Sequence, residues 1–566
     1  MKKFTKLFLM ITAFGFIFLF SCSEEETPKR KPTVTATPGT IEGEEGENFT
    51  ITVNWSAEAG IQGLSCSKPE VTVPSGLAGT SGTFDTEYML GSEDETVTFT
   101  IVDMDGVEST DSFIATVSAI KTITDADLVG GETYNFTKDK QYLLDGLVYL
   151  EKDGILNIEA GTVIKFRKSP SNSDPTSALI ITRGAQINAE GTVDEPIIFT
   201  AEADEITQQS LLPSENQQWA GLVLLGSAPV MKGGNTLLQI EGISTSEPRG
   251  RYGWGDTDFP AADPMDNSGI LKYVSIRYTG FALNGQSGDE IQGLTLGGVG
   301  SGTVIDYVES FSSDDDGIEI FGGTVDIKHF IVAFAADDSY DLDQGWRGTG
   351  QYLFALQGDG TVSKYDHLGE WDGFGNASDD PFSAPNILNA TFIGPGQNLT
   401  DTLSDRAILW REGFAGKLIN SIVTDVPNYG LQIRNEIGDE FSSCATITNP
   451  RDGFQSEIYN TTWAIIGPYD GADIKTALGG QCNDVMATML IDNDCAVLED
   501  GILEDISSRT SGIDPRPTGA FTGSTLNPAS IGISGEETSY QGAFEPGQDL
   551  WLKGWSTLSK YGYTVQ

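Results

Sequence analysis

The chain has 566 residues, among them 67 glycines and 23 prolines, and its 33 basic and 82 acidic side chains give a formal net charge of −49. So long a chain exceeds one compact core, and its short apolar runs between turn residues predict all-β domains or a repeat array. The charge makes nucleic acid and anionic lipid poor partners and favours cations or cationic surfaces, although the need for solubility alone also explains this charge.

Residues 1–21 have the pattern of a signal peptide. Three lysines precede the apolar run 7–20, which is too short to span a bilayer. The run ends in Leu-Phe-Ser-Cys, which resembles a bacterial lipobox and implies cleavage before Cys22 and acylation of that residue, for example with palmitate.

The next residues resemble the acidic export tag of Bacteroidota lipoproteins, which implies a lipid-anchored protein on the outer membrane, facing the cell exterior. The tag consists of Ser23, Glu24, Glu25 and Glu26. An acidic tether that faces the periplasm is the alternative. Residues 22–31 as a whole are expected to be a tether and linker.

Four cysteines remain, an even number that suits an oxidising compartment. Cys482 and Cys495 each border an acidic turn, and we predict a local disulfide between them. Cys66 and Cys444 are expected to be buried thiols. The spacing is not that of a zinc site, and the chain has only two histidines to complete one.

Residues 32–120 alternate apolar and polar positions, with turn residues every 8 to 12 positions. This pattern predicts a small β-sandwich, which resembles the immunoglobulin-like spacers of bacterial surface proteins. Asp103, Asp105 and Gly106 are interpreted as a hairpin turn rather than as a calcium site.

Residues 121–535 are predicted to form a parallel β-helix. The lines that begin at Asp315 and Asp337 match at an offset of 22 residues, with strand-like alternation inside each copy. Gly-Thr-Val recurs five times before β-branched runs, as tight corners of a solenoid require. The region should hold on the order of a dozen coils.

The same offset predicts columns of carboxylates, because stacked coils lie about 4.8 Å apart. Two such charges repel by about 1 kcal/mol in water and by more near a protein surface. We therefore predict a calcium site, with raised carboxyl pKa values, a counter-charge from Arg347, or splaying into solvent as alternatives. The candidate ligands are Asp314, Asp315, Asp316, Glu319, Asp337, Asp338, Asp341 and Asp343.

A long insertion at residues 239–267 is expected to form a surface rim that carries binding residues. Four aromatic residues are candidate sugar platforms: Tyr252, Trp254, Trp346 and Trp371. Packing inside the coil is the alternative for each of them and is preferred for Trp346. Residues 536–566 break the period and predict a short amphipathic helix that caps an open coil end.

Several motifs carry a family resemblance: Asp-Asp-Asp-Gly-Ile-Glu-Ile-Phe, Asp-Asp-Ser-Tyr-Asp-Leu-Asp, Glu-Trp-Asp-Gly-Phe and the closing Trp-Leu-x-Gly-Trp. From about Asp145 onward the chain resembles Bacteroidota outer-membrane lipoproteins with a right-handed β-helix. The resemblance implies a surface component, often associated with uptake or assembly complexes built on a TonB-dependent-receptor-type barrel. The expected fold is thus an immunoglobulin-like β-sandwich followed by a right-handed parallel β-helix with a C-terminal cap.

Three functions remain open. We favour a non-catalytic binding or scaffold subunit that contacts an outer-membrane barrel, with glycan binding as the alternative. A polysaccharide hydrolase or lyase is the second alternative, but no catalytic residue is assigned. His329 lies in an apolar run, and His367 lies in an insertion. A lyase would need calcium and a basic side chain, for which Arg406 and Arg411 are available, but Arg411 is expected to pair with Glu412.

Overall fold

The computed structural model divides into two compact units, one that ends at Ser118 and one that begins at residue 119. The residues that it describes are 30–43, 46–118, 120–283, 290–373, 379–397, 399, 406–434, 443–469, 471 and 473–565. The expected lipidation site and export signal lie outside these ranges: Cys22, Ser23, Glu24, Glu25 and Glu26. Among the described helices, none combines the length and apolar character needed to cross a bilayer.

The first unit is a β-sandwich, as the alternating pattern predicted. Its three-stranded antiparallel sheet contains β1 (Thr33–Thr37), β3 (Asn48–Ser56) and β5 (Ser81–Met89). Its four-stranded sheet contains β2 (Thr40–Gly43), β7 (Glu108–Val117), β6 (Glu95–Asp103) and β4 (Ile61–Cys66). Every second side chain of the central strands is buried between the sheets, for example Ile51 and Val53 of β3.

The acidic turn after β6 is a hairpin turn. The Asp103 carboxylate accepts hydrogen bonds from the backbone N–H groups of Asp105 and Val107, at 3.0 and 2.8 Å. The carboxylate thus satisfies the turn's own donors, which agrees with the preferred interpretation of this sequence.

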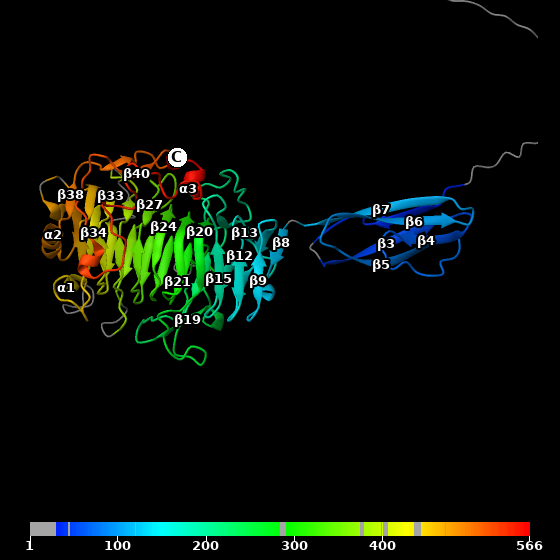
Figure 1. The fold of residues 1–566 in the computed structure, drawn as a ribbon, viewed down its shortest axis with the longest axis horizontal. Coiled ribbons are helices and arrows are strands. Elements are labelled where there is room, and N and C mark those ends of the chain that lie inside the picture. Colours follow the sequence, from blue (N-terminus) through cyan, green and yellow to red (C-terminus); the bar gives the residue numbers. More distant parts are fainter. Residues whose placement is uncertain are drawn as a thin grey trace, which may run out of the picture. The chain divides into compact units, whose positions relative to one another are not determined.

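The second unit is a parallel β-helix, which confirms the main sequence prediction (Figure 1). Its ten-stranded sheet contains, in spatial and chain order, β11 (Leu147–Leu150), β14 (Ala178–Ile181), β17 (Leu222–Leu225), β21 (Leu294–Gly297), β23 (Ile318–Phe321), β25 (Tyr340–Asp343), β28 (Gly369–Asp372), β31 (Arg406–Arg411), β34 (Tyr429–Ile433) and β37 (Leu478–Gly480).

A nineteen-stranded parallel sheet forms the remaining faces of the coils. Its strands are β8 (Ile120–Ile123), β9 (Thr133–Phe136), β10 (Gln141–Leu144), β12 (Ile155–Ile158), β13 (Val163–Phe166), β15 (Gln186–Glu190), β16 (Ile197–Ala201), β20 (Gly269–Arg277), β22 (Val304–Phe311), β24 (Ile327–Ala333), β26 (Thr349–Gln351), β27 (Phe354–Leu356), β29 (Asn386–Leu388), β30 (Thr391–Ile393), β32 (Lys417–Ile419), β33 (Ile422–Val426), β35 (Glu457–Tyr459), β36 (Thr462–Ile466) and β38 (Ala496–Leu498).

Side chains that point into the coil form one continuous apolar core. Ile318 and Ile320 of β23 and Leu342 of β25 are at most 1% exposed and belong to that core. Because successive side chains of a strand point to opposite faces, the residues between them lie on the outside of the ten-stranded sheet. The positions outside this sheet therefore form columns that run from coil to coil.

One corner of the nineteen-stranded sheet carries a stack of rings, which we call the corner ladder. Tyr273, Tyr307, His329 and Tyr352 stack with centroid separations of 4.5, 4.2 and 4.8 Å. All four have positive φ, between 46° and 60°, which is strained for residues with a side chain. Stacking of the rings helps to offset this strain. His329 is thus a packing residue of the corner ladder, and its Nδ1 lies 2.8 Å from Asp306 Oδ1.

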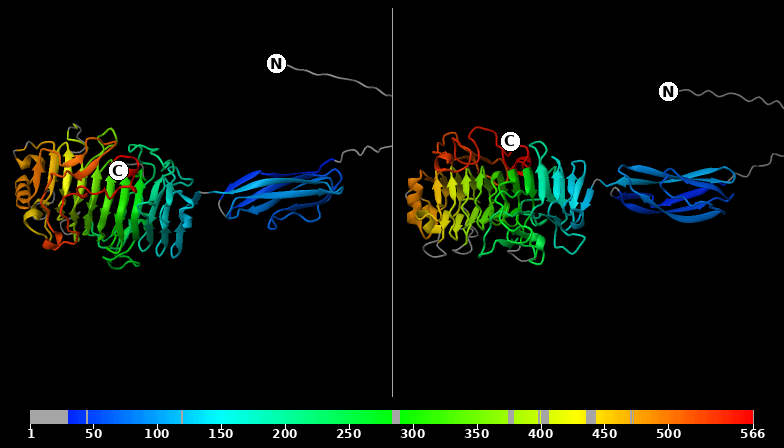
Figure 2. Two further views of the ribbon diagram at one scale, coloured as in Figure 1. Left: turned by 45° about the horizontal axis from the view of Figure 1, so that its top comes forward. Right: turned by 60° about the horizontal axis from the view of Figure 1, so that its bottom comes forward.

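The C-terminal segment, residues 499–565, returns along the outside of the nineteen-stranded sheet and does not cover a coil end (Figures 1 and 2). The Trp555 ring meets Tyr273 edge to face at 5.7 Å, and the Asn389 side chain donates to Thr538 at 2.9 Å. The prediction that this segment caps an open coil end is wrong, and the predicted helix is reduced to the four residues of α3 (Thr557–Lys560). The spaced aromatic residues pack across successive coils.

Short elements decorate this segment. They are β39 (Leu503–Asp505), β40 (Asp514–Pro517), the 3₁₀ helix η4 (Pro528–Ile531) and the four-residue helix α3 (Thr557–Lys560). The Glu309 carboxylate, fully buried in β22, accepts the backbone N–H groups of Thr557 and Leu558 at 2.7 and 3.1 Å. This carboxylate attaches the end of the chain to the middle of the solenoid.

The helix α2 (Asn483–Asp492) packs beside β35 and β37, the last strands of their stacks, with α1 (Ser443–Thr448) and the 3₁₀ helix η3 (Ile474–Ala477) near it. A disulfide joins Cys444 to Cys482 here. The predicted Cys482–Cys495 bond is wrong, because α2 separates these two residues. Cys495 and Cys66 are free thiols.

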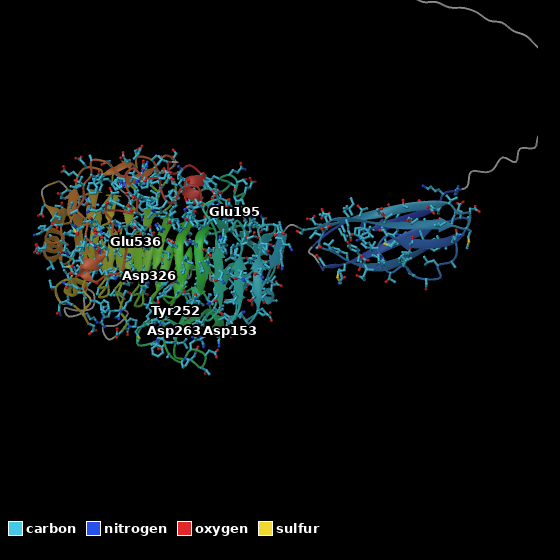
Figure 3. The ribbon with its side chains drawn as sticks, viewed as in Figure 1. Asp153, Glu195, Tyr252, Asp263, Asp326 and Glu536 are labelled. Carbon is cyan, nitrogen blue, oxygen red and sulfur yellow. A yellow bond between two sulfur atoms is a disulfide. The ribbon has the colours of Figure 1, made fainter. Side chains whose placement is uncertain are left out.

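The insertion occupies residues 226–268, between β17 and β20, and contains β18 (Leu237–Gln239), the 3₁₀ helix η2 (Pro248–Gly250) and β19 (Arg251–Gly253). It packs against the outside of the ten-stranded sheet. Val230, Ile240 and Tyr252 form an apolar cluster with Val223 of β17 and Phe321 of β23. The insertion is thus anchored over the first coils by its own small core. Tyr252 lies on this side of the unit, away from Glu536 of the C-terminal segment (Figure 3).

Candidate functional site

The acidic candidates gather on the outside of the ten-stranded sheet. β23 pairs with β25 so that Glu319 lies opposite Asp341, and β25 pairs with β28 so that Asp341 lies opposite Glu370. The offset of 22 residues therefore gave the correct register between β23 and β25. Asp341, Glu319 and Glu370 form one outer column, three coils long.

Five carboxylates from two coils form what we call the carboxylate cluster: Asp315, Asp316, Glu319, Asp337 and Asp341. Oxygens of Asp316, Glu319 and Asp341 lie within 4.8 Å of one another, and so do oxygens of Asp315, Asp316 and Asp337. Asp316 is common to both groups. Asp316 and Glu319 are only 6% and 5% exposed, so water screens their charges poorly.

Burial and mutual repulsion both act on these groups. Removal from water raises the pKa values of Asp316, Glu319 and Asp341 well above their ordinary values, and neighbouring carboxylates raise them further. Burial and the adjacent Asp338 raise the pKa of Asp337 to about 6. The cluster must therefore hold protons or bind a cation when it is placed at neutral pH.

One oxygen of the cluster lacks a hydrogen-bond partner. Asp341 Oδ1 is shielded from solvent and has no hydrogen-bond partner among the described residues. Asp316, in contrast, accepts a hydrogen bond from the backbone N–H of Asp338 at 2.9 Å. A set of carboxylate oxygens with one unpartnered buried member matches the ligands that a hard divalent cation prefers.

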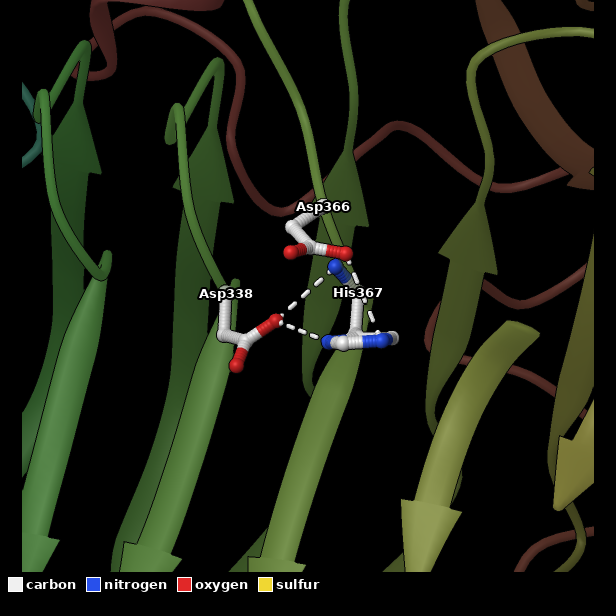
Figure 4. A group of neighbouring side chains, drawn as sticks. All are labelled: Asp338, Asp366 and His367. Atoms are coloured by element: carbon white, nitrogen blue, oxygen red, sulfur yellow. Dashed lines mark hydrogen bonds and ion pairs between the residues drawn. The ribbon is translucent and has the colours of Figure 1, made fainter. Parts of the chain in front are cut away.

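Beside the cluster lies a second group, the histidine cluster of Asp338, Asp366 and His367 (Figure 4). His367 Nδ1 lies 2.7 Å from Asp338 Oδ1, and the His367 backbone N–H donates to the same oxygen at 2.8 Å. His367 Nε2 lies 3.3 Å from Asp366 Oδ1. Both ring nitrogens therefore face carboxylates.

This environment favours the imidazolium form. Burial lowers the pKa of His367, but the charge and hydrogen bond of Asp338 and the charge of Asp366 outweigh it, so that the pKa is raised. Burial also raises the pKa of Asp366 to about 6. The histidine cluster thus places a carboxyl group with a pKa of about 6 beside an imidazole whose pKa is raised, an arrangement that suits proton transfer.

The sequence prediction placed His367 in an insertion and gave it no role in the acidic site. A signal was present. Trp371 lies opposite Leu342, and aligning Glu370-Trp371 with Asp341-Leu342 would have placed His367 on Asp338.

The remaining acidic candidates have partners of their own. Asp343 lies 3.3 Å from Lys232 of the insertion, and Asp314 contacts Gln217 and lies 3.7 Å from Lys364. Neither belongs to the carboxylate cluster.

The predicted counter-ions also differ. Arg347 pairs with Asp380 at 2.9 Å rather than with the cluster. Arg411 binds Glu370 and Asp372, each at 2.5 Å, rather than its neighbour Glu412. Arg411 lies opposite Asp372 in the next coil, and long-range stacking therefore overrides proximity in sequence.

Three of the four candidate sugar platforms are buried. Trp346 and Trp371 are fully enclosed in the coil core. Trp371 points inward from β28, whereas Trp346 lies between β25 and β26 and donates its indole N–H to the carbonyl of Val325 at 3.0 Å. Tyr252, in β19 of the insertion, is 1% exposed, and its hydroxyl donates to the side-chain oxygen of Gln344 at 2.5 Å. The platform prediction is therefore wrong for Tyr252 and Trp371, whereas the packing that we preferred for Trp346 is confirmed. Trp254 alone among the four keeps partly exposed surface.

The stacked coils define a parallel β-helix protein. Its candidate site, the carboxylate and histidine clusters, lies on the outside of the ten-stranded sheet. Comparison with protein families matches residues 129–461 to the pectate-lyase like beta helix domain. The chain belongs to this family. No curated protein matches it significantly. No solved structure does so either.

Proposed function

We propose that this protein is a lipid-anchored binding protein of the outer membrane, facing the cell exterior, whose carboxylate cluster binds Ca²⁺. The observation that carries the proposal is the group of Asp316, Glu319 and Asp341, with the unpartnered Asp341 Oδ1 inside it. Lys232 and Arg411 interact electrostatically with Glu319 and Asp341, respectively, and a divalent cation would supply further positive charge to this group.

We further propose that the ligand class is glycan. Ca²⁺ takes six to eight oxygen ligands, and sugar hydroxyl groups can fill positions that the cluster leaves open. The insertion rises beside the cluster, where Lys232 reaches Asp343, so that it borders the region in which such a ligand would lie. The function that this geometry supports best is calcium-dependent glycan binding without catalysis.

Calorimetric titration tests this proposal. We expect Ca²⁺ to bind the wild-type protein and Glu319→Gln to weaken binding at least tenfold. Glu190→Gln, at an exposed glutamate of the nineteen-stranded sheet, should leave the affinity unchanged. Retention on immobilised polysaccharides should then require Ca²⁺ and disappear in chelator. Equal Ca²⁺ affinity in wild type and Glu319→Gln would overturn the cation site.

The anchor and the partner belong to the same proposal. Cys22→Ser should abolish palmitate labelling and release the protein from outer membranes. Affinity purification from solubilised membranes should yield a stoichiometric barrel protein if the β-helix serves as a subunit of an uptake or assembly complex. Recovery of the chain alone would remove the scaffold role but not glycan binding.

The histidine cluster favours a second candidate, a polysaccharide hydrolase or lyase. Asp366 and His367 have the proton-transfer properties that such a reaction needs, and the family is named for its likeness to pectate lyases. Incubation with acidic and neutral polysaccharides would reveal new reducing ends for a hydrolase or unsaturated ends for a lyase. Products that are absent in His367→Asn would replace the non-catalytic proposal with this one.

A further inference from the structure

A pocket lies between the insertion and the first coils, away from the carboxylate and histidine clusters. It has a volume of about 380 Å³ and is bordered by the turns after β11 and β14 and by η2, β19 and the residues that follow. Four of its lining residues are basic: Lys152, Arg183, Arg249 and Arg251. This concentration stands out in a chain with 33 basic and 82 acidic residues.

Two of these arginines are held in place. Arg183 donates to Asp256 at 2.5 Å and to the carbonyl of Gly253 at 3.0 Å. Arg249 pairs with Glu247 at 2.9 Å, and its guanidinium lies 4.0 Å from the centre of the Tyr149 ring. These contacts fix the insertion to the coils and make two rigid walls of the pocket.

The other two cations are less committed. The Arg251 guanidinium makes no hydrogen bond or ion pair with any residue that the structure describes. Among the described residues, Lys152 Nζ has one ion-pair partner, the carboxylate of Asp258 at 3.8 Å, and it lies 5.5 Å from the centre of the Phe259 ring. Both side chains can therefore turn toward a ligand without breaking a close ion pair.

The three lining carboxylates do not cancel this charge. Asp256 is already paired with Arg183 at 2.5 Å and Glu151 with Arg249 at 3.2 Å, so that Asp258 is the one lining carboxylate left to balance Lys152 and Arg251. The half-buried Phe259 ring adds an apolar wall. A small pocket with two available cations and one aromatic wall fits a sugar that carries an anionic group.

We propose that this pocket, defined by Lys152, Arg251 and Phe259, binds an anionic monosaccharide unit. The anionic group of this sugar is a carboxylate, sulfate or phosphate. Lys152 and Arg251 bind it through the negative charge that all three groups carry. The site is independent of bound Ca²⁺ and lies on different coils from the carboxylate cluster, so each site can fail without the other.

Titration of the full-length protein in chelator tests the site. The probes are glucuronate, glucose 6-sulfate and glucose 6-phosphate, with glucose as the neutral comparison. We expect at least one anionic probe to bind at least tenfold more tightly than glucose. The double variant Lys152→Gln/Arg251→Gln should lose at least tenfold in affinity for that probe, and the preferred probe identifies the anion.

The matched control is Lys272→Gln, at a lysine of β20 that lies outside this pocket and 3.8 Å from Glu190. It changes the net charge but should leave affinity unaltered. Equal affinity of the double variant and the wild type, or binding of every anion no tighter than glucose, would overturn the proposal. Equal losses in the double variant and the control would show a general charge effect and would overturn it as well.

Discussion

Glu319 shows how the stacking of coils brings a buried carboxylate close to other carboxylates that repel it. It is 5% exposed and has two carboxylates within 4.8 Å. In chelator we expect Glu319→Gln to stabilise the protein by about 1 kcal/mol, because a neutral amide removes the repulsion of a buried charge. Chemical denaturation of wild type and variant measures this difference.

The control for this prediction is Glu190→Gln, which should change the free energy of unfolding by less than about 0.5 kcal/mol, as surface substitutions usually do. In saturating Ca²⁺ the order should reverse, since Glu319→Gln then loses a ligand. Destabilisation by Glu319→Gln in both conditions would mean that the carboxylate is held by contacts within the protein.

The raised carboxyl pKa values predict how stability depends on pH. Burial is the main cause of the raised pKa values of Asp337, Asp366 and Glu370, which are about 6, 6 and 7. Because the folded protein holds these protons more tightly than the unfolded chain, their stabilising contribution is complete below about pH 4 and declines as the pH rises through 6 and 7.

The melting temperature in chelator should therefore fall between pH 5 and pH 8, and Ca²⁺ should remove most of the fall. In the variant Asp337→Asn/Glu370→Gln the decline should be smaller. Scanning calorimetry across this range checks both statements. A steeper decline in the variant than in the wild type would contradict them.

The elements at the end of the solenoid depend on the disulfide. Cys444 and Cys482 are 38 residues apart, and their bond joins α1 to the start of α2. Cys482→Ser should cost about 2–4 kcal/mol, the usual range for a native disulfide, whereas Cys495→Ser should cost less because its thiol is unpaired. Peptide mapping without reduction should show the Cys444–Cys482 link. A Cys482–Cys495 peptide would contradict this structure.

The C-terminal segment depends on a buried acceptor. Glu309→Ala leaves the N–H groups of Thr557 and Leu558 without their partner, which should cost about 1–3 kcal/mol. Hydrogen exchange should then accelerate over residues 551–563 and remain slow in the first coils. Glu545→Ala, at an exposed position of the same segment, is the control and should leave exchange unchanged.

At the scale of the whole molecule, local alternation and the 22-residue offset predicted the β-sandwich, the parallel β-helix and the column that contains Glu319 and Asp341. These features follow from periodicity, which a single sequence displays. His367 was missed because it lies next to Asp338 only when coils of unequal length stack. The predictions of the disulfide and of the C-terminal cap were wrong for a related reason, since both features depend on contacts between residues that are far apart in the sequence.

The buried aromatic residues illustrate the same limit. Trp371 was a candidate platform because the sequence does not show which face of its strand is inward. The register with Trp410 and Leu342 places it in the core and turns Glu370 outward. Residue type alone suggested that Trp371 binds a ligand. In the stacked coils Trp371 packs in the core, and the Glu370 carboxylate lies on the outer face.

The central claim is that the stacked carboxylates bind a cation, and diffraction from crystals grown with millimolar Ca²⁺ tests it most directly. We predict an anomalous difference peak within about 2.3–2.6 Å of oxygens of Asp316, Glu319 and Asp341. Crystals of Glu319→Gln grown in the same way should lack the peak. Carboxyl groups that hydrogen-bond to one another at full Ca²⁺ concentration, with no peak between them, would contradict the account.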